Sequence, residues 1–127
     1  MIVVGLGWQK TALAADALDL VARSLSMVEV GRCDYVAAPA FKQGNLLPQT
    51  VADAWGARVL WINKDLLQQE QARCQTFSAT VKGLVGLASI AEACALAGAG
   101  KGAEARLCLP RQIFYGVTCA VAKGERK

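Results

Sequence analysis

The stretch IVVGLGWQKT, residues 2–11, contains the residue types of an anion site. Gly5 and Gly7 allow a sharp backbone turn, and Lys10 and Thr11 precede an Ala/Leu-rich segment. The N–H groups and positive dipole end at the start of a helix would favour a carboxylate or phosphate beside Lys10. A tight strand-to-helix turn, in which the glycines only permit close packing, explains the same residues equally well.

The stretch departs from both common nucleotide-binding motifs. The dinucleotide fingerprint G-x-G-x-x-G requires a third glycine where Lys10 stands. A P-loop requires a glycine directly before the Lys-Thr pair, and this position is Gln9. We therefore expect neither a dinucleotide nor ATP.

Two further lysines, Lys42 and Lys64, also follow predicted strands. Ligands of open parallel sheets bind beyond the carboxyl ends of the strands, so we expect both to share one edge with Lys10. Three cations there would suit an anionic ligand, with Trp8 and Phe41 in apolar contact with it. Each lysine taken alone is explained better as a solvated loop charge, and burial in the core explains Trp8 equally well.

The residue types missing from the 127-residue chain restrict its chemistry. It contains no histidine, which removes the usual general base, the usual zinc ligand and any Ser–His or Cys–His pair. Its five cysteines form no C-x-x-C pair and are expected to be small core residues in a reducing compartment. The net charge of +4 is spread along the chain and indicates no nucleic-acid partner. We predict no metal and no cofactor, and we assign no catalytic residue.

The elements that must position these residues alternate between strands and helices. The apolar residues 2–6 predict a strand buried on both faces, followed by a helix with Thr11 as its N-cap. Strands are also predicted at 35–38 and 59–62. A helix is expected to contain Pro48 in its first turn, run to Trp55 and stop at Gly56, and a short one to start at Asn63 or Asp65 and run through Gln71.

Two serines mark helix starts in the second half of the chain. Ser78 is one, and Ser89-x-x-Glu92 is a capping box, which favours a structural role for Glu92 over a catalytic one. We expect Gly98 to close that helix and residues 97–104 to form a flexible surface turn. The closing strands are predicted at 105–109 and 117–122, joined as a hairpin by PRQIFYG.

The pattern predicts the α/β class, with one three-layer α/β/α domain over residues 1–123 and a polar tail at 124–127. Its sheet is expected to be mixed and mostly parallel, with about five strands, and to end in an antiparallel hairpin. The chain lacks an apolar stretch of the roughly 20 residues that a membrane span requires, and its first residues are too short for a signal sequence. We expect no membrane partner and a cytoplasmic location.

Three segments carry a pattern that local structure alone does not explain. They are VVGLGWQKT, followed by the lone Lys42; S-x-x-V-K-G-L-V-G-L-A-S-I-A-E-A-C-A-L at 78–96; and LPRQIFYGVTCAVA at 109–122. Together they resemble the CobE/CbiG C-terminal family of cobalamin biosynthesis. The resemblance covers nearly the whole chain, and V-G-x-x-S-[IV]-A-E-A followed by G-V-T-x-A-V-A is its most specific part. It implies an α/β/α domain that acts in corrin-ring assembly.

The resemblance also implies a ligand. The chain is similar to the stand-alone CobE form associated with the oxygen-dependent pathway, so the implied role is to bind or handle an anionic precorrin or corrin intermediate. Proteins of the CbiG type open the ring lactone of cobalt-precorrin-5A and release acetaldehyde, so a lactone hydrolase is the alternative. Other enzymes of the pathway and a second copy of the chain are further partners to consider.

The family pattern can be carried over to single positions. The acidic pair that often follows the family's lysine is replaced here by Gly44 and Asn45, which argues against acid–base work by this loop. Arg111 keeps the charge of a usual lysine. A serine-hydrolase triad is excluded because no histidine is present. The matching positions are Gly5, Gly7, Lys42, Ser78, Gly86, Ser89, Glu92 and Thr118, and the predicted ligand-binding set is Gly5, Gly7, Trp8, Lys10, Thr11, Phe41, Lys42, Lys64, Ser78, Ser89 and Glu92.

Overall fold

A computed structural model describes residues 1–70, 90–100 and 105–124. Within them one sheet contains five strands in the order β3-β2-β1-β5-β4. β1, β2 and β3 are parallel, and β5 is antiparallel to both of its neighbours. This confirms the mixed, mostly parallel sheet that ends in a hairpin. The strands are β1 (Ile2–Trp8), β2 (Tyr35–Pro39), β3 (Arg58–Ile62), β4 (Arg106–Phe114) and β5 (Val117–Lys123).

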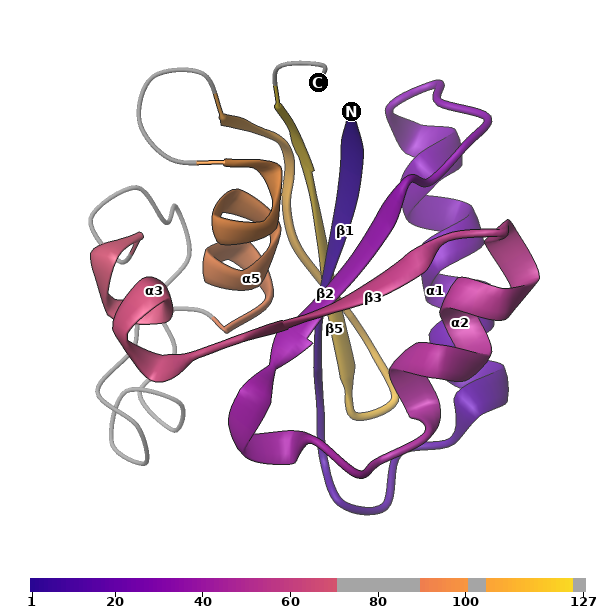
Figure 1. Ribbon diagram of the computed structural model, residues 1–127. Coiled ribbons are helices and arrows are strands. Elements are labelled where there is room, and N and C mark those ends of the chain that lie inside the picture. Colours follow the sequence, from indigo (N-terminus) through magenta and orange to yellow (C-terminus); the bar gives the residue numbers. More distant parts are fainter. Residues whose placement is uncertain (71–89, 101–104, 125–127) are drawn as a thin grey trace.

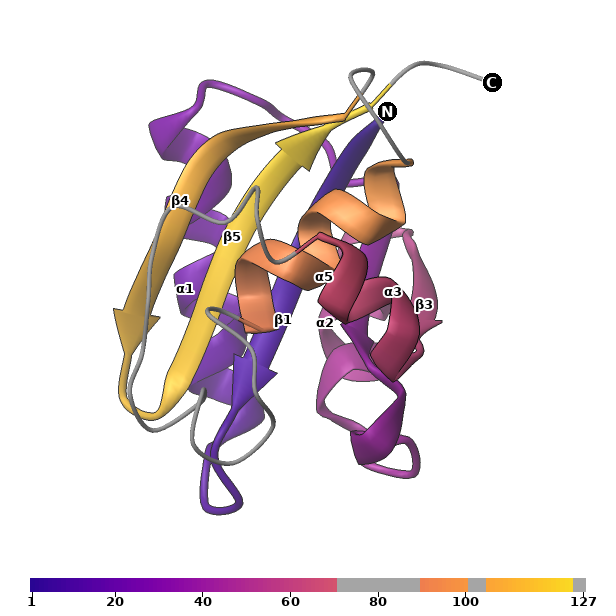
Figure 2. The same cartoon turned by 90° about the vertical axis from the view of Figure 1, so that its left-hand side faces the viewer.

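Helices cover both faces of the sheet, which confirms the three layers (Figure 1). One face carries α1 (Ala14–Met27) and α2 (Leu47–Trp55). The other carries α3 (Lys64–Gln69) and α5 (Ile90–Ala99), and Figure 2 shows α5 lying across the central strands. A 3-10 turn, Ala40–Lys42, follows β2. Each face therefore has its own apolar core, and β1 is buried between the two along its whole length.

Gly5 and Gly7 lie inside β1 and not in a loop, which corrects the predicted glycine turn. A Cβ on Gly5 would overlap the backbone of α5 at the carbonyl of Ala91 and the N–H of Ala95. A Cβ on Gly7 would lie 2.7 Å from Thr118 Oγ1. The close-packing explanation of these glycines is therefore the correct one.

The start of α1 also differs from the prediction. The N-cap is Leu13 and not Thr11, and no side chain caps this end. The residues between β1 and α1 form a loop held by the N–H of Ala12, which donates to the carbonyl of Gln9 at 3.0 Å. Thr11 is exposed in that loop.

Two helices of the middle segment follow their local signals. Pro48 lies in the first turn of α2, and Gly56 ends that helix in the left-handed region at φ 65°. Asn63 caps α3, because its side-chain oxygen accepts from the N–H of Leu66 at 2.9 Å. The short helix ends at Gln69. The helix start predicted at Ser78 lies outside the described residues.

The end of α5 and the final hairpin depart from the prediction. α5 continues through Gly98 to Ala99, and a Cβ on Gly98 would lie 2.9 Å from Val3 Cγ1, so this glycine permits packing on β1. β4 extends through the PRQIF residues to Phe114, and the connection to β5 is only the two residues Tyr115 and Gly116. Of the predicted surface turn, residues 97–99 are helical and 101–104 lie outside the described residues.

The cysteines and the chain ends complete the fold. Cys33, Cys94 and Cys119 are buried, which confirms their packing role, and Cys108 is half-buried. Gly124, the first residue of the predicted tail, is buried, and its N–H donates to the carbonyl of Met1 at 3.0 Å. Among the described residues, no helix has the length and apolar character needed to cross a bilayer.

Candidate functional site

The three parallel strands end at one edge of the sheet, the lower edge in Figure 1. The loops that follow β1 and β2, residues 9–13 and 40–46, lie at this edge. The β4–β5 turn at Tyr115 and Gly116 joins it, since the N–H of Gln9 donates to the carbonyl of Gly116 at 2.8 Å. We call these three segments, 9–13, 40–46 and 115–116, the carboxyl edge.

Lys42 is held at this edge by two contacts with Trp8. It ends the 3-10 turn after β2, and its Nζ donates to the main-chain carbonyl of Trp8, the last residue of β1. The same Nζ lies 5.1 Å from the centroid of the Trp8 ring, close enough for a cation–π contact. The structure therefore brings together two residues of the predicted set.

The environment of Lys42 is unusual for a lysine. The side chain is half-buried, and this desolvation lowers its pKa below the usual value of 10.5. In residues 1–70, 90–100 and 105–124 the salt bridges join Arg23 to Asp19 and Arg32 to Asp34, and none involves Lys42. An ammonium group has three donors, and one of them is used by a neutral carbonyl. Lys42 is thus a half-buried cation that can still bind an anion.

Trp8 has a different position from the one predicted for a ligand contact. Its side chain is only 6% exposed and belongs to the core beneath α1 and α2. Little of the ring is open to a ligand, so Trp8 acts at this edge by holding Lys42 with its carbonyl and its ring face. Of the two explanations of Trp8 from the sequence, burial agrees with the structure.

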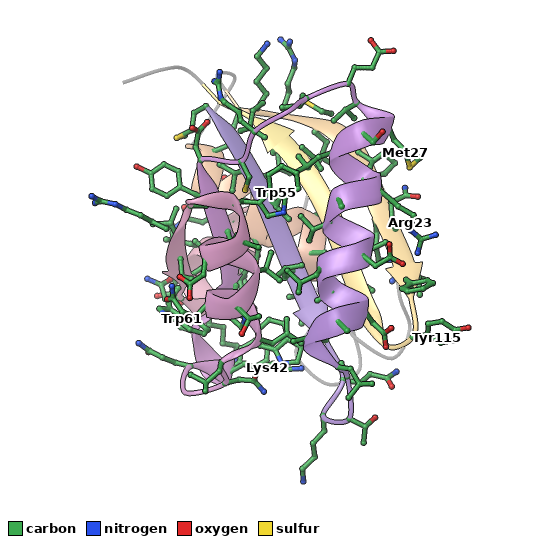
Figure 3. The ribbon with its side chains drawn as sticks, turned by 90° about the vertical axis from the view of Figure 1, so that its right-hand side faces the viewer. Arg23, Met27, Lys42, Trp55, Trp61 and Tyr115 are labelled. Carbon is green, nitrogen blue, oxygen red and sulfur yellow. The ribbon has the colours of Figure 1, made fainter. Side chains whose placement is uncertain are left out.

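Large apolar side chains gather at the carboxyl edge. Six are strongly exposed among the described residues, and four of these belong to the edge. Figure 3 shows Lys42 and Tyr115 toward the same end of the molecule. Of these four residues the sequence pattern indicated only Phe41, although Tyr115, a large apolar residue directly before Gly116, carries a local turn signal that could have found it. The four exposed fractions are 63% for Leu13, 51% for Phe41, 75% for Leu46 and 74% for Tyr115.

The other predicted cations lie at the ends of the strands but make no contact with Lys42. Lys10 is exposed in the loop after β1, beside Thr11. Lys64 is exposed at the start of α3, on the other face of the sheet. Ser78 and Ser89 lie outside the described residues. The strands that precede the three lysines therefore end at one edge, as predicted. Among the described residues, the Lys42 amine is the one of the three lysine amines that is bonded there to another predicted residue.

Glu92 and Thr118 lie on the α5 face of the sheet and connect elements. Glu92 is fully buried in the first turn of α5, and its Oε2 accepts from the backbone N–H of Arg111 in β4 at 2.8 Å. Thr118 Oγ1 in β5 donates to the carbonyl of Gly7 in β1 at 3.3 Å. The Ser89 half of the predicted capping box lies outside the described residues. The observed contact gives Glu92 a structural role, because it joins the edge strand β4 to α5.

A separate hollow of about 440 Å³ opens at the opposite edge of the sheet. None of the predicted site residues lines it. Arg32 and Lys123 contribute cations to it and Glu29 contributes an acid, so its charge is mixed. Among the described residues no group of histidines, cysteines or carboxylates gathers as a metal site would require.

Comparison with known proteins decides the family. The sequence model of the family described as Cobalamin synthesis G C-terminus matches residues 2–122. The chain belongs to this family. The Cobalamin synthesis G C-terminus match spans the strands, both helical layers and the carboxyl edge, so it confirms the resemblance seen in the three sequence segments.

Solved structures agree with this membership. The crystal structure of CobE, a protein from the cobalamin (vitamin B12) biosynthetic pathway, is similar with a TM-score of 0.89 and 24% identity, over 99% of this chain and 93% of that chain. The cobalamin biosynthesis protein chiG from Agrobacterium tumefaciens strain C58 is similar with a TM-score of 0.75 and 26% identity, over 99% of this chain and all of that chain (100%).

A third structure has the same fold within a longer protein. The putative cobalamin biosynthesis protein G homolog from Sulfolobus solfataricus has a TM-score of 0.65 and 21% identity, over 99% of this chain but only 37% of that chain. The likenesses to CobE and to the Sulfolobus protein concern the fold alone. No curated protein matches the chain. This member of the Cobalamin synthesis G C-terminus family thus corresponds in length to the two shorter relatives.

Proposed function

We propose that the chain binds an anionic corrin or precorrin intermediate of cobalamin biosynthesis at the carboxyl edge. The observation that carries this proposal is the half-buried Lys42 amine, which among the described residues has a neutral carbonyl and a ring face as its partners and no carboxylate. Membership of a cobalamin synthesis family supplies the ligand class.

The chemistry of the edge suits such a ligand. Corrin precursors carry carboxylates around a broad apolar macrocycle, and mostly apolar sites with a few placed polar groups bind ligands of this kind. Phe41, Leu46 and Tyr115 would lie against the ring, and Lys42 would pair with a peripheral carboxylate. Because Lys42 is partly desolvated, this ion pair would be stronger than one between two exposed side chains.

The proposal is tested by titrating the protein with hydrogenobyrinic acid, a cobalt-free corrin, and following its absorption spectrum. The parent protein should shift the spectrum, and Lys42→Met should weaken binding about tenfold or more, the usual effect of losing a hydrogen bond to a charged group. Lys123→Met is the matched control, because Lys123 is an exposed lysine at the opposite edge. An unchanged spectrum at saturating corrin, or equal affinity in parent and Lys42→Met, would reject the proposal.

The same amine supports a second candidate, the opening of a lactone on the corrin periphery. A fixed cation in a partly dry site stabilises the negative charge that develops on an ester carbonyl during hydrolysis. Lys42 is half-buried and its position is fixed, which favours this role. The discriminating measurement is the release of acetaldehyde from a lactone-bearing precorrin, and its absence would leave only binding.

A further inference from the structure

Tyr115 has a backbone conformation that tyrosine rarely adopts. Its φ is 48° and that of Gly116 is 78°, and these two residues form the whole connection between β4 and β5. A two-residue hairpin with positive φ at both positions is a type I′ turn, which prefers asparagine or aspartate followed by glycine. Gly116 fits its position, whereas a bulky side chain at positive φ is strained. The first position of the turn thus carries a residue that the turn itself disfavours.

The helix end that explains a similar conformation elsewhere does not apply to Tyr115. In the part of the chain that the structure describes, Glu29 is the other non-glycine residue with positive φ. It follows Val28, the C-cap of α1, and a left-handed residue is a common way for a helix to end. Strained backbone positions are concentrated at ligand sites, where binding depends on the position of the side chain. Tyr115 lies at such a candidate site, the carboxyl edge.

The Tyr115 ring is positioned by its neighbour but remains open to solvent. It contacts Phe114 edge-on, with the ring centroids 4.5 Å apart and the planes at 64°. Phe114 is covered in turn by Arg23, whose guanidinium lies 4.1 Å from the centroid of the Phe114 ring. Tyr115 nevertheless remains 74% exposed. The contact with Phe114 therefore orients the ring while burying little of its area to offset the strain of the turn.

The turn is bonded to the same end of β1 that holds Lys42. The N–H of Gln9 donates to the carbonyl of Gly116 at 2.8 Å, and Oε1 of Gln9 lies 3.2 Å from the place that a Cβ on Gly116 would occupy. Gln9 directly follows Trp8, whose carbonyl accepts from Lys42. Figure 3 shows Lys42 and Tyr115 toward the same end of the molecule. The end of β1 thus positions both the amine and the exposed ring.

We infer that Tyr115 recognises the conjugated face of the corrin ligand by stacking its ring against it. This inference rests on the proposed function and deepens it, since Lys42 would bind a carboxylate and Tyr115 would select for the flat ring that carries it. A side chain that is already oriented by its backbone and by Phe114 loses little conformational freedom on binding. The protein would therefore discriminate against polycarboxylates that lack a conjugated ring.

Replacement of Tyr115 by asparagine should change stability and affinity in opposite directions. Tyr115→Asn gives the turn its preferred residue type, so the unfolding temperature of the ligand-free protein should rise by about 2–5 °C. The Kd for hydrogenobyrinic acid should rise about fivefold to tenfold, because the stacking contact is lost. A purely structural role of Tyr115 predicts the reverse for stability and no change in affinity.

Two further variants serve as controls. Tyr115→Phe keeps the ring, so its Kd should stay within about twofold of the parent value. Met27→Asn alters an apolar side chain that is 60% exposed at the other end of the molecule, and it should leave the Kd unchanged (Figure 3). Unchanged affinity in Tyr115→Asn overturns the inference, as does a lower unfolding temperature in that variant. An equal loss of affinity in Tyr115→Phe also overturns it, since the contact would then belong to the hydroxyl group.

A measurement on the unmodified chain makes the test independent of the variants. The chain contains two tyrosines, and Tyr35 begins β2 at the opposite edge of the sheet. With the tyrosine rings isotopically labelled, the NMR signals of Tyr115 should shift when hydrogenobyrinic acid is added, and those of Tyr35 should not. Citrate, a polycarboxylate without a conjugated ring, should shift neither. Tyr115 signals that the corrin leaves in place overturn the inference.

The outcomes separate this inference from the proposed function. If Lys42→Met weakens corrin binding and Tyr115→Asn does not, only the role of Tyr115 fails. If the parent protein binds no corrin, the proposed function fails with it.

Discussion

The amine of Lys42 lies over the ring of Trp8, 5.1 Å from its centroid, and donates a hydrogen bond to the carbonyl of the same residue. Thirty-four positions separate the two in the chain. This contact joins the ends of β1 and β2 and fixes a cation where the two strands finish. The dependence of ligand binding on pH should therefore report on this amine.

Binding of a carboxylated corrin should weaken with rising pH as Lys42 loses its proton. Because burial lowers the pKa of Lys42, the loss should occur below 10.5, the usual lysine value. The Lys42→Arg variant keeps its positive charge over the same pH range, so its affinity for the corrin should not decline. Affinities measured between about pH 7 and pH 10 check this, and a parallel decline in both proteins would contradict it.

Replacement of Gly5 by alanine should destabilise the protein strongly. The added methyl group would overlap the backbone of α5, which cannot move without separating the helix from β1. Overpacking of this kind costs about 1–3 kcal/mol or more in the free energy of unfolding, which urea denaturation measures. Gly31→Ala is the control, since a Cβ there meets nothing within 4 Å. Equal unfolding midpoints for the two variants would refute the close-packing explanation.

Asp34 should contribute stability that is lost in acid. Its carboxylate accepts the N–H of Ile2 at 2.7 Å, and this bond, followed by the contact with Arg32, lowers its pKa below 3.8. Because the pKa of Asp34 is lower in the folded protein than in the unfolded chain, its contribution to stability is complete above pH 3.8. That contribution is lost as the pH falls through the pKa of Asp34 in the folded protein. Since Asp34 is partly exposed, we expect about 1 kcal/mol or less.

The check on Asp34 is the free energy of unfolding between about pH 2 and pH 6. Asp34→Asn should be less stable than the parent at pH 6, and the difference should shrink toward pH 2. Asp53→Asn, which alters an exposed carboxylate bonded to Gln49, serves as the control. A constant difference across this range would show that the charge on Asp34 has no part in its contribution.

The buried thiols should resist alkylation in the folded protein. Burial raises the pKa of Cys33 and of Cys119 to about 12, so almost no thiolate is present near neutral pH. Cys108 is half-buried and should react before either of them. Peptide mapping after brief exposure to iodoacetamide measures the order, with urea-unfolded protein as the reference. Modification of Cys119 as fast as that of Cys108 would oppose this expectation.

The elements that follow local rules were predictable from the sequence. Pro48 and Gly56 delimit α2 because the first fits a helix start and the second adopts a left-handed conformation, and both preferences are properties of the residue itself. Asn63 caps α3 for the same kind of reason. The buried central strand followed from an uninterrupted apolar, β-branched run.

The features that depend on contacts between residues distant in the chain were not predictable from the sequence. Gly5 and Gly98 are glycines because α5 and β1 approach each other there, and the local pattern resembles a turn in one case and a helix stop in the other. The strand predicted at 105–109 stops before Pro110 because proline normally ends a hydrogen-bonded ladder. In the structure a β-bulge accommodates Pro110, and β4 continues beyond it.

At the candidate site, the sequence indicated the edge at which the parallel strands end, and it selected Lys42, which the structure places against Trp8. Lys42 was recognised because it follows a strand, which is a local signal. The burial of Trp8 arises from tertiary packing, so no spacing in the chain reveals it. Tyr115 joins the edge only through a two-residue hairpin turn whose length was predicted wrongly.

Met1 and Gly124 exchange backbone hydrogen bonds, of 3.3 Å from the amino group of Met1 and 3.0 Å from the N–H of Gly124, at the end of the sheet away from Lys42. A short linker can therefore join these two positions, and a circular permutant with new ends in the exposed residues 31–32 should keep the same sheet. Any fused protein or affinity tag attached at Met1 or Gly124 would likewise leave the carboxyl edge unobstructed.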